Sequence, residues 1–214
     1  LATELVGQGP TVPYERCVRT IIGRGPEPSQ PELKRRRVAE LLAAAGHPSN
    51  DVASLLAAVD AWRAARRVPS KSIAAVGDAF VVHYDALSAR HLMPHLPPEM
   101  ARVPRANVRF LAIENAWFSG SMNYLGHARR ADRSPEYEAT YELNAALEIS
   151  VPEFQQLVSH EVVPGHVTTF AYLQDLYVRG LVGFEASVLT MNTRAGVLFE
   201  GIANNAILIA HGVL

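Results

Sequence analysis

The sequence predicts a mainly helical α+β protein with one small antiparallel β-sheet. Helical spacing of apolar residues, rich in Ala and Leu, covers residues 29–92 and returns over residues 150–211. Between these stretches, residues 108–144 hold short runs of β-forming residues separated by Gly, Asp, Ser and Pro. With 49% of its 214 residues apolar, the chain can form one or two compact domains with a sizeable core.

The first part of the chain predicts three helices. The sequence Ser29-Gln30-Pro31-Glu32 has the pattern of a capping box, and it opens a helix that Gly46 can end. The second helix covers residues 51–67, and the third covers residues 72–92 before a group of prolines. Their Ala and Leu content favours a helical bundle, so we interpret residues 1–104 as one helical region.

Residues 105–214 predict a second region. Residues 108–113, 121–127 and 139–144 have the composition of three strands, which we expect to form the antiparallel sheet. A second capping-box pattern, Ser150-Val151-Pro152-Glu153, opens a further helix. Helices over residues 167–179 and 194–211 follow. Because an apolar helical pattern runs almost to residue 214, we expect this region to continue beyond it.

Composition excludes several classes of partner. The formal net charge is −1 and the isoelectric point is near 6.8, which favours neither a nucleic acid nor an anionic membrane. No leader and no apolar run of membrane-spanning length is present. The single cysteine, Cys17, cannot form an internal disulfide, which fits a reducing compartment. We therefore predict a cytoplasmic protein without a membrane or nucleic-acid partner; the sequence does not predict its oligomeric state.

The segment His160-Glu161-Val162-Val163-Pro164-Gly165-His166 is the strongest indication of chemistry. Hydrolytic zinc sites use three protein ligands and keep one position for water, whose proton a nearby carboxylate accepts. The familiar motif places its two histidines four residues apart on one helical face. Here they are six apart, and a regular helix would turn them to different faces, about 240° apart.

Pro164 and Gly165 resolve this difficulty. Proline removes a helical hydrogen bond and glycine tolerates unusual backbone angles, so the pair predicts a break or bulge that returns His166 to the face of His160. The alternative is that the helix ends at Val163, Pro164-Gly165 forms an ordinary turn, and His166 begins the next helix.

The string HEVVPGH resembles the HExxPGH signature of a bacterial metallopeptidase-like family, domain of unknown function 885. That family is itself distantly similar to the thermolysin-like glutamate-zincins. Residues 199–203, 123–126 and 141–144 resemble weaker motifs of the family, whereas Val167 and Ile202 depart from them. The resemblance implies a zincin-like catalytic core, following the N-terminal helical bundle, with Zn²⁺ as its cofactor.

The resemblance assigns roles to individual residues. His160 and His166 are expected as metal ligands, with Glu161 as the general base. Glu200 matches the family position of the third ligand, and Glu185 is its competitor because its spacing from His166 is closer to that of thermolysin-like enzymes.

Further polar residues are weaker candidates. Asn204 lies one helical turn after Glu200 and can orient a ligand histidine. The alternative is that its side chain only satisfies nearby backbone groups. The resemblance implies that Asn144 binds the substrate backbone, against the alternative of a strand-end asparagine. The candidates for stabilising the developing oxyanion, which the sequence leaves open, are Tyr124, His127, Tyr141 and Arg194.

These observations predict a zinc-dependent hydrolase, in particular a metallopeptidase acting on a peptide or peptide-like substrate. Two alternatives remain at this point. One is a metal-dependent hydrolase of small amides or esters. The other is a catalytically silent helical scaffold that keeps a structural metal, although such a site has no need of Glu161 as a base.

Overall fold

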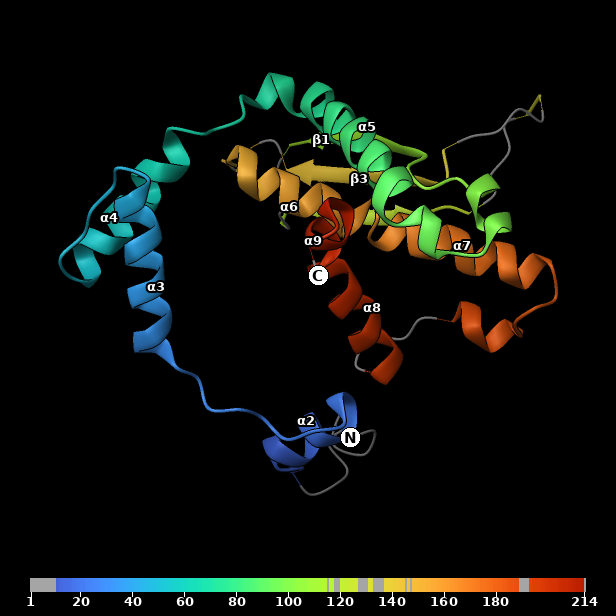
Figure 1. The fold of residues 1–214 in the computed structure, drawn as a ribbon, viewed down its shortest axis with the longest axis horizontal. Helices are drawn as coiled ribbons and strands as arrows, with labels where there is room; N and C mark the ends of the chain where they lie inside the picture. The colour runs from blue at the N-terminus through green and yellow to red at the C-terminus, as the bar shows by residue number, and fades with distance from the viewer. Residues whose placement is uncertain are drawn as a thin grey trace.

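The computed structural model describes residues 11–114, 116–117, 120–126, 131–132, 137–144, 146, 148–188 and 193–213 (Figure 1). Over these residues the protein is mainly helical with one three-stranded sheet, which confirms the predicted α+β class. None of the described helices combines the length and apolar character needed to cross a membrane.

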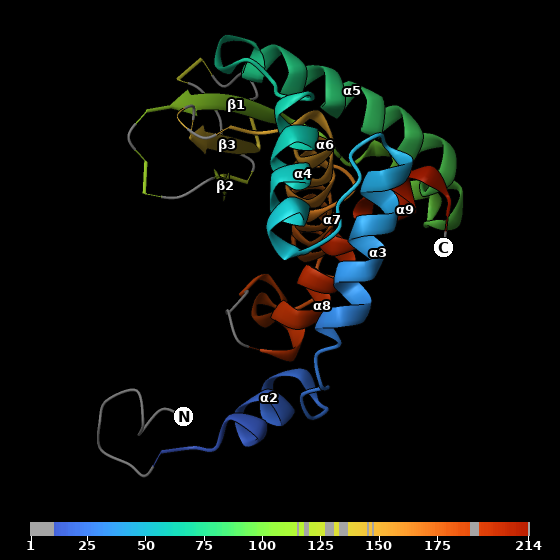
Figure 2. The same ribbon diagram turned by 90° about the vertical axis from the view of Figure 1, so that its left-hand side faces the viewer.

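Three helices lead to the body of the protein: α2 (Tyr14–Ile22), α3 (Pro31–Ala44) and α4 (Val52–Ala64). Helices α3 and α4 pack on each other to one side of the sheet (Figures 1 and 2). The capping box predicted at Ser29 is wrong, because α3 begins after Gln30 without a side-chain cap and Pro31 already occupies its first turn.

A long helix, α5, then crosses the sheet. It spans Ile73–His91, close to the predicted range, and short 3₁₀ turns lie on either side of it. These turns are η1 (Ser70–Ser72), η2 (Met93–His95) and η3 (Pro98–Arg102).

The sheet consists of β1 (Val108–Ile113), β2 (Gly120–Tyr124) and β3 (Ala139–Asn144), in the order β1-β3-β2. Strand β3 pairs parallel to β1 and antiparallel to β2, so the sheet is mixed and the antiparallel prediction is wrong. The reason is non-local. The chain reverses between β1 and β2 and again before β3, and β3 then inserts between them parallel to β1.

Four helices complete the described chain: α6 (Val151–Glu161), α7 (His166–Val178), α8 (Arg194–Asn204) and α9 (Ala206–His211), with the 3₁₀ turn η4 (Phe184–Ser187) between α7 and α8. The capping box at Ser150 is confirmed, since its N–H and its hydroxyl both donate to Glu153 Oε2, at 2.9 and 2.7 Å. The single helix predicted over residues 194–211 is two helices. Asn205 separates them, and its Nδ2 donates to the carbonyl of Gly201 at 2.8 Å.

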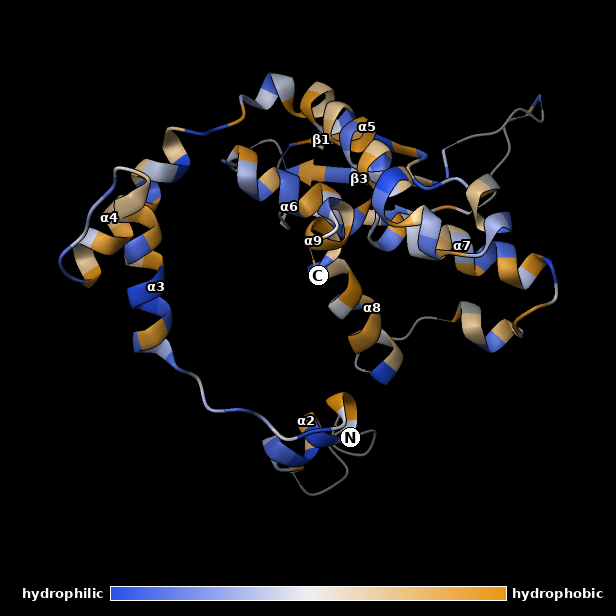
Figure 3. Ribbon diagram, in the orientation of Figure 1, coloured by the Kyte–Doolittle hydropathy of each residue, from blue (hydrophilic) through white to orange (hydrophobic). Residues whose placement is uncertain are grey.

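The core lies between the sheet and helices α5 and α6. Phe110 of β1 contacts Tyr141 of β3 and Phe154 of α6 edge to face, with ring centroids 5.5 and 6.0 Å apart. Both Tyr141 and Phe154 are almost fully buried. Figure 3 shows apolar residues along α8 and α9, whereas α3 carries a polar stretch that includes its basic run. Because the buried Phe154 packs against Phe110 of the sheet and Phe80 of α5, these elements hold α6 in place.

Candidate metal centre

The connection between α6 and α7 brings the two histidines of the motif together. Helix α6 ends at Glu161 and α7 begins at His166, so the predicted break around Pro164 and Gly165 is confirmed. The imidazole centroids of His160 and His166 are 4.9 Å apart and their planes are nearly perpendicular. The alternative, in which the helix ends and His166 begins the next one, is also met, although α6 ends at Glu161 and not at Val163. The turn between the two helices still brings the histidines together.

Gly165 is required by the closeness of two backbone segments. A Cβ atom placed on Gly165 would lie 1.7 Å from the carbonyl oxygen of His160 and 2.5 Å from that of Ser159. Such distances are far inside van der Waals contact, so a side chain cannot be accommodated without moving the backbone. The tight turn therefore depends on glycine at this position. The peptide bond between Val163 and Pro164 is cis.

Helix α8 brings a carboxylate to the two histidines. Glu200 Oε1 lies 3.4 Å from His166 Nε2, and Oε2 lies 3.5 Å from His160 Nε2. Thr193 caps this helix by accepting a hydrogen bond from the Gly196 N–H at 3.1 Å. Across the described residues, a group of possible metal ligands is formed by His160, His166 and Glu200, with one ligand atom from each within 4.8 Å of the others.

The donor set and its spacing fit a zinc ion. Two ligand atoms bound tetrahedrally to one zinc, each about 2.1 Å away, lie about 3.4 Å apart. The separations between histidine nitrogen and Glu200 oxygen, 3.5 Å to Oε2 and 3.4 Å to Oε1, are close to this value, and one ligand atom from each of the three residues lies within 4.8 Å of the others. Two histidines and one glutamate are also a ligand set of hydrolytic zinc sites. His160, His166 and Glu200 could therefore hold zinc.

Burial controls the charge of this group. The side chain of His166 is 10% exposed, whereas that of Glu200 is 48% exposed. Burial lowers the pKa of His166, and the neighbouring His160 lowers it further, against the opposing effect of Glu200. The neutral imidazole is the form that can bind a metal. Nδ1 of His166 is buried and has no hydrogen-bond partner within the described residues, which marks it as an unsatisfied group in the site.

Glu161 lies beside the histidines on the last turn of α6 and is half-buried. Burial raises its pKa to about 7, and the negative charge of Glu200 contributes to the same shift. Glu161 in turn adds to the effect of burial in raising the pKa of Tyr141. The charge of Glu161 therefore interacts with that of Glu200 and with the Tyr141 hydroxyl. A carboxylate that titrates near neutral pH is suited to accept and return a proton.

The structure gives Asn144 a structural position at the end of β3. Its side chain is buried, and its Nδ2 donates to the carbonyl of Ala116 at 2.8 Å while its Oδ1 accepts from the N–H of Ala146 at 3.0 Å. These contacts match the strand-end alternative. Tyr141 is close to Glu161 but is 1% exposed, in the centre of the sheet.

The remaining candidates are Tyr124, Arg194, Asn204 and His127. Tyr124 donates to Gln174 Oε1 at 2.7 Å. Arg194 begins α8 and is exposed, six residues before Glu200, which corresponds to about 9 Å along the helix. Asn204 is also exposed, and its carbonyl accepts from Gln156 Nε2 at 3.3 Å. His127 falls outside the described residues.

Glu185, the competitor for the third ligand, lies on η4. Its side chain is exposed, and its carboxylate lies against Gly183 in the same turn. Among the described residues it does not join the group formed by His160, His166 and Glu200.

Phe170 is a site residue that the sequence reasoning missed. Its ring stacks on the imidazole of His166 with centroids 5.7 Å apart and an interplanar angle of 8°. It also contacts Phe199 of α8 and Tyr124 of β2, at 6.0 and 5.4 Å. The helical spacing of four residues after His166 could have pointed to it.

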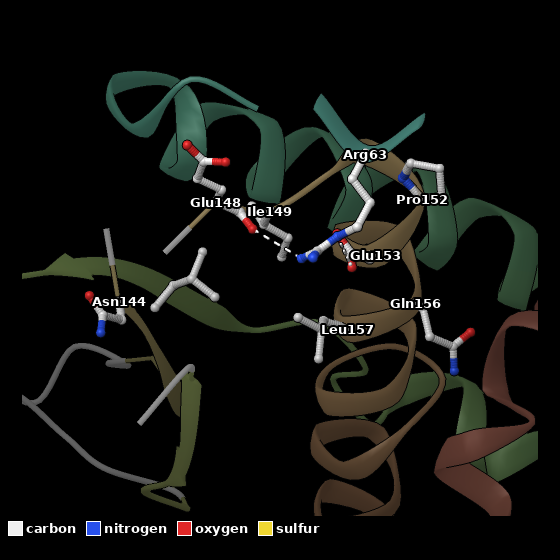
Figure 4. A pocket seen from close by; sticks show the side chains of 9 residues that line it. Arg63, Asn144, Glu148, Ile149, Pro152, Glu153, Gln156 and Leu157 are labelled. Carbon is white, nitrogen blue, oxygen red and sulfur yellow. Dashed lines mark hydrogen bonds and ion pairs between the residues drawn. The ribbon is translucent and has the colours of Figure 1, made fainter. Parts of the chain in front are cut away.

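Two cavities border the helices that carry the histidines, and neither is lined by His160, Glu161, His166 or Glu200. The first, of about 580 Å³, lies between the start of α6 and the end of β3, and we name it the α6 cavity (Figure 4). Its walls include Leu143, Asn144, Ile149, Pro152 and Leu157, with Arg63 at its edge. The second, of about 530 Å³, lies along α7, and we name it the α7 cavity. Its walls include Tyr124, Gly126, Phe170, Leu173, Gln174 and Tyr177.

Comparison with protein-family models, with curated proteins and with solved structures found no match to this chain. The resemblance to the HExxPGH family and the zincin-like core that it implies therefore stay predictions.

Proposed function

We propose that this protein is a zinc-dependent hydrolase, and specifically a metallopeptidase that cleaves a peptide or peptide-like substrate. One observation carries the proposal. The Nε2 atoms of His160 and His166 converge on the carboxylate of Glu200 at 3.5 and 3.4 Å, with the partly buried Glu161 next to them. This combination joins a ligand set suited to zinc with a carboxylate suited to proton transfer.

Each residue then has a defined part. His160, His166 and Glu200 hold the zinc ion. When bound, zinc polarises the substrate carbonyl and lowers the pKa of a water molecule from its value in bulk. Glu161 accepts the proton of the attacking water on its carboxylate and passes it to the leaving nitrogen. The burial of His166 and the stacked Phe170 exclude bulk water from one side of the ligands.

The half-buried position of Glu161 favours a hydrolase over a silent metal scaffold. A structural site gains nothing from a second carboxylate beside Glu200, because the two negative charges repel each other. The ionised Glu161 therefore lowers the stability of the fold, and a role in proton transfer explains why a carboxylate is present at this position. We also propose a cytoplasmic location. The single cysteine, Cys17, cannot form an internal disulfide, which fits a reducing compartment. Fractionation of cells that express the chain would test that part.

The test combines metal content with hydrolysis of a peptide library. We expect one zinc per chain, which Glu200→Gln should remove. Glu161→Gln should keep the metal but lower the rate by on the order of 10²–10⁴. Glu185→Gln is the matched control, since this exposed glutamate lies apart from the histidines. The proposal fails if the purified chain takes up no stoichiometric zinc, or if Glu161→Gln hydrolyses the library as fast as the parent.

A further inference from the structure

The two cavities lie at opposite ends of the same stretch of sheet. Leu143, at the end of β3, borders the α6 cavity, whereas Tyr124, at the end of β2, borders the α7 cavity. Tyr124 pairs with Ala139, four residues before Leu143 on β3. At about 3.3 Å per residue, this places the two cavities about 13 Å apart along the sheet.

The metal ligands lie between these two ends. Tyr141 is midway between Ala139 and Leu143 on β3, and its ring contacts that of Phe110, which in turn contacts Phe154 of α6. Tyr141 and Leu143 are both buried, and alternate residues of a strand point to the same face. Helix α6, whose last turn carries His160 and Glu161, therefore packs over this span of the sheet.

The helices give the same order independently. On α6, Leu157 of the first cavity precedes Glu161 by four residues, and on α7, Phe170 of the second follows His166 by four. Each step is one helical turn, about 6 Å. Figure 1 shows α6 and α7 extending to opposite sides of α9, and Figure 4 shows Leu157 pointing from α6 toward the end of β3.

The walls of the two cavities differ in chemistry. The α6 cavity is bordered by the aliphatic side chains of Leu143, Ile149 and Leu157, and the ion pair of Arg63 with Glu153 neutralises its edge. The α7 cavity instead presents three aromatic rings: Tyr124, Phe170 and Tyr177. Aromatic walls favour an aromatic group in stacked or edge-to-face contact, whereas aliphatic walls favour aliphatic groups.

From this placement we infer that the substrate is an extended peptide cleaved internally, with an aliphatic side chain in the α6 cavity and an aromatic side chain in the α7 cavity, on opposite sides of the cleaved bond. The inference rests on the proposed function and names the substrate class of the same site. A small amide bound at the proposed metal site, between the two cavities, would reach neither of them. A peptide covers the 13 Å span with about four residues.

The test uses short quenched-fluorescent peptides with one Leu and one Phe in a background of Gly, Ser and Ala. We expect that zinc-loaded protein prefers a pair about four residues apart, by about tenfold over peptides carrying either residue alone. Mass spectrometry should place the cut between the two residues. Binding of the same peptides to zinc-loaded Glu161→Gln, followed by fluorescence anisotropy, should show the same preference without turnover.

Two matched variants separate the cavities. Leu157→Trp fills the α6 cavity and should remove only the gain from Leu, while Leu173→Trp fills the α7 cavity and should remove only the gain from Phe. Leu157→Ala and Tyr177→Ala, which open the walls instead of filling them, cover the case in which a tryptophan variant misfolds. They should likewise each weaken the preference on one side alone.

The outcomes distinguish this inference from the proposed function. Cleavage without any dependence on Leu or Phe, or loss of the same gain in both tryptophan variants, overturns the inference and leaves the hydrolase intact. Two-sided binding to Glu161→Gln without cleavage by the parent supports the inference and overturns the proposed hydrolysis. Absence of both binding and cleavage overturns both.

Discussion

The ring of Phe170 lies flat against the imidazole of His166, 8° from parallel and with centroids 5.7 Å apart. Because both residues are on α7, one turn apart, this stack fixes the direction in which the His166 nitrogens point. The same ring forms a wall of the α7 cavity, so it links the orientation of a proposed ligand to the proposed substrate site.

Removing that stack should weaken metal binding. Phe170→Ala frees the His166 ring, and loss of an orienting partner typically lowers metal affinity by about 10–100-fold. Phe170→Tyr, which keeps an aromatic face, should retain most of the affinity. Competition with a chromogenic zinc chelator measures both. Parental affinity in Phe170→Ala would show that the stack does not orient the ligand.

Gly165→Ala should disrupt the turn between α6 and α7. Its Cβ would lie 1.7 Å from the carbonyl oxygen of His160, so the backbone must move and the two histidines should separate. We expect loss of zinc binding and a free energy of unfolding lower by several kcal/mol.

The matched control for this change is Gly201→Ala on α8, where an added Cβ meets nothing within 4 Å. It should leave stability unchanged or raise it by about 0.4–1 kcal/mol, because alanine restricts the unfolded chain. Denaturant unfolding followed by circular dichroism compares the two. Equal stability of both variants would mean that the close approach at Gly165 can relax.

The metal-free protein should lose stability as pH rises from about 4.5 to about 7 because of Glu161. Its pKa is raised from 4.5 to about 7 by burial and by Glu200, so between these values the folded state binds more protons than the unfolded state. The stabilising contribution is complete below about pH 4.5 and is lost as pH rises through about 7.

Glu161→Gln should remove this part of the pH dependence, because the amide does not titrate. The measurement is the difference in unfolding free energy between parent and variant across pH 4–8, in the presence of a chelator. Glu185→Gln serves again as the control and should preserve the parental slope. A constant difference between parent and Glu161→Gln would contradict a raised pKa.

Loss of the helix cap at Thr193 should lower the zinc affinity, through Glu200 on the same helix, and should lower the stability of the fold only slightly. Thr193→Ala removes the acceptor for the Gly196 N–H and should cost about 1 kcal/mol of stability. Because Glu200 is on the same helix, zinc affinity should fall as well. Ser150→Ala removes a cap residue from α6, which the core also holds through Phe154, so its zinc affinity should change less.

The sequence predicted the parts of the fold that local patterns control. Helices α4 and α5 begin and end within a few residues of their predicted limits, and proline and the capping box at Ser150 mark real boundaries. Strand pairing was wrong because the partner of β1 is set by a strand many residues away. The division of α8 from α9 was missed because Asn205 ends the first helix through its own side chain, which periodicity does not reveal.

The site was predictable to a similar degree. Histidine, proline and glycine within one short segment indicated both the break and the convergence of His160 with His166. The choice of Glu200 over Glu185 depended on a family resemblance, and the structure places Glu200 against both rings. Phe170 and the α7 cavity were missed because they depend on how α7 packs against β2, and the α6 cavity was missed because it depends on how α6 packs against the end of β3.

The three residues that surround the proposed zinc come from three different helices, and forty residues of chain separate His160 from Glu200. An ion bound here is therefore a cross-link that closes a long loop, and it stabilises the fold as a disulfide does, by restricting the unfolded chain. The half-exposed Glu200 is repelled by Glu161 when no cation lies between them. Helix α8 is then the element whose attachment depends on the ion, and limited proteolysis after chelation should cut beside α8 before it cuts the sheet or α5.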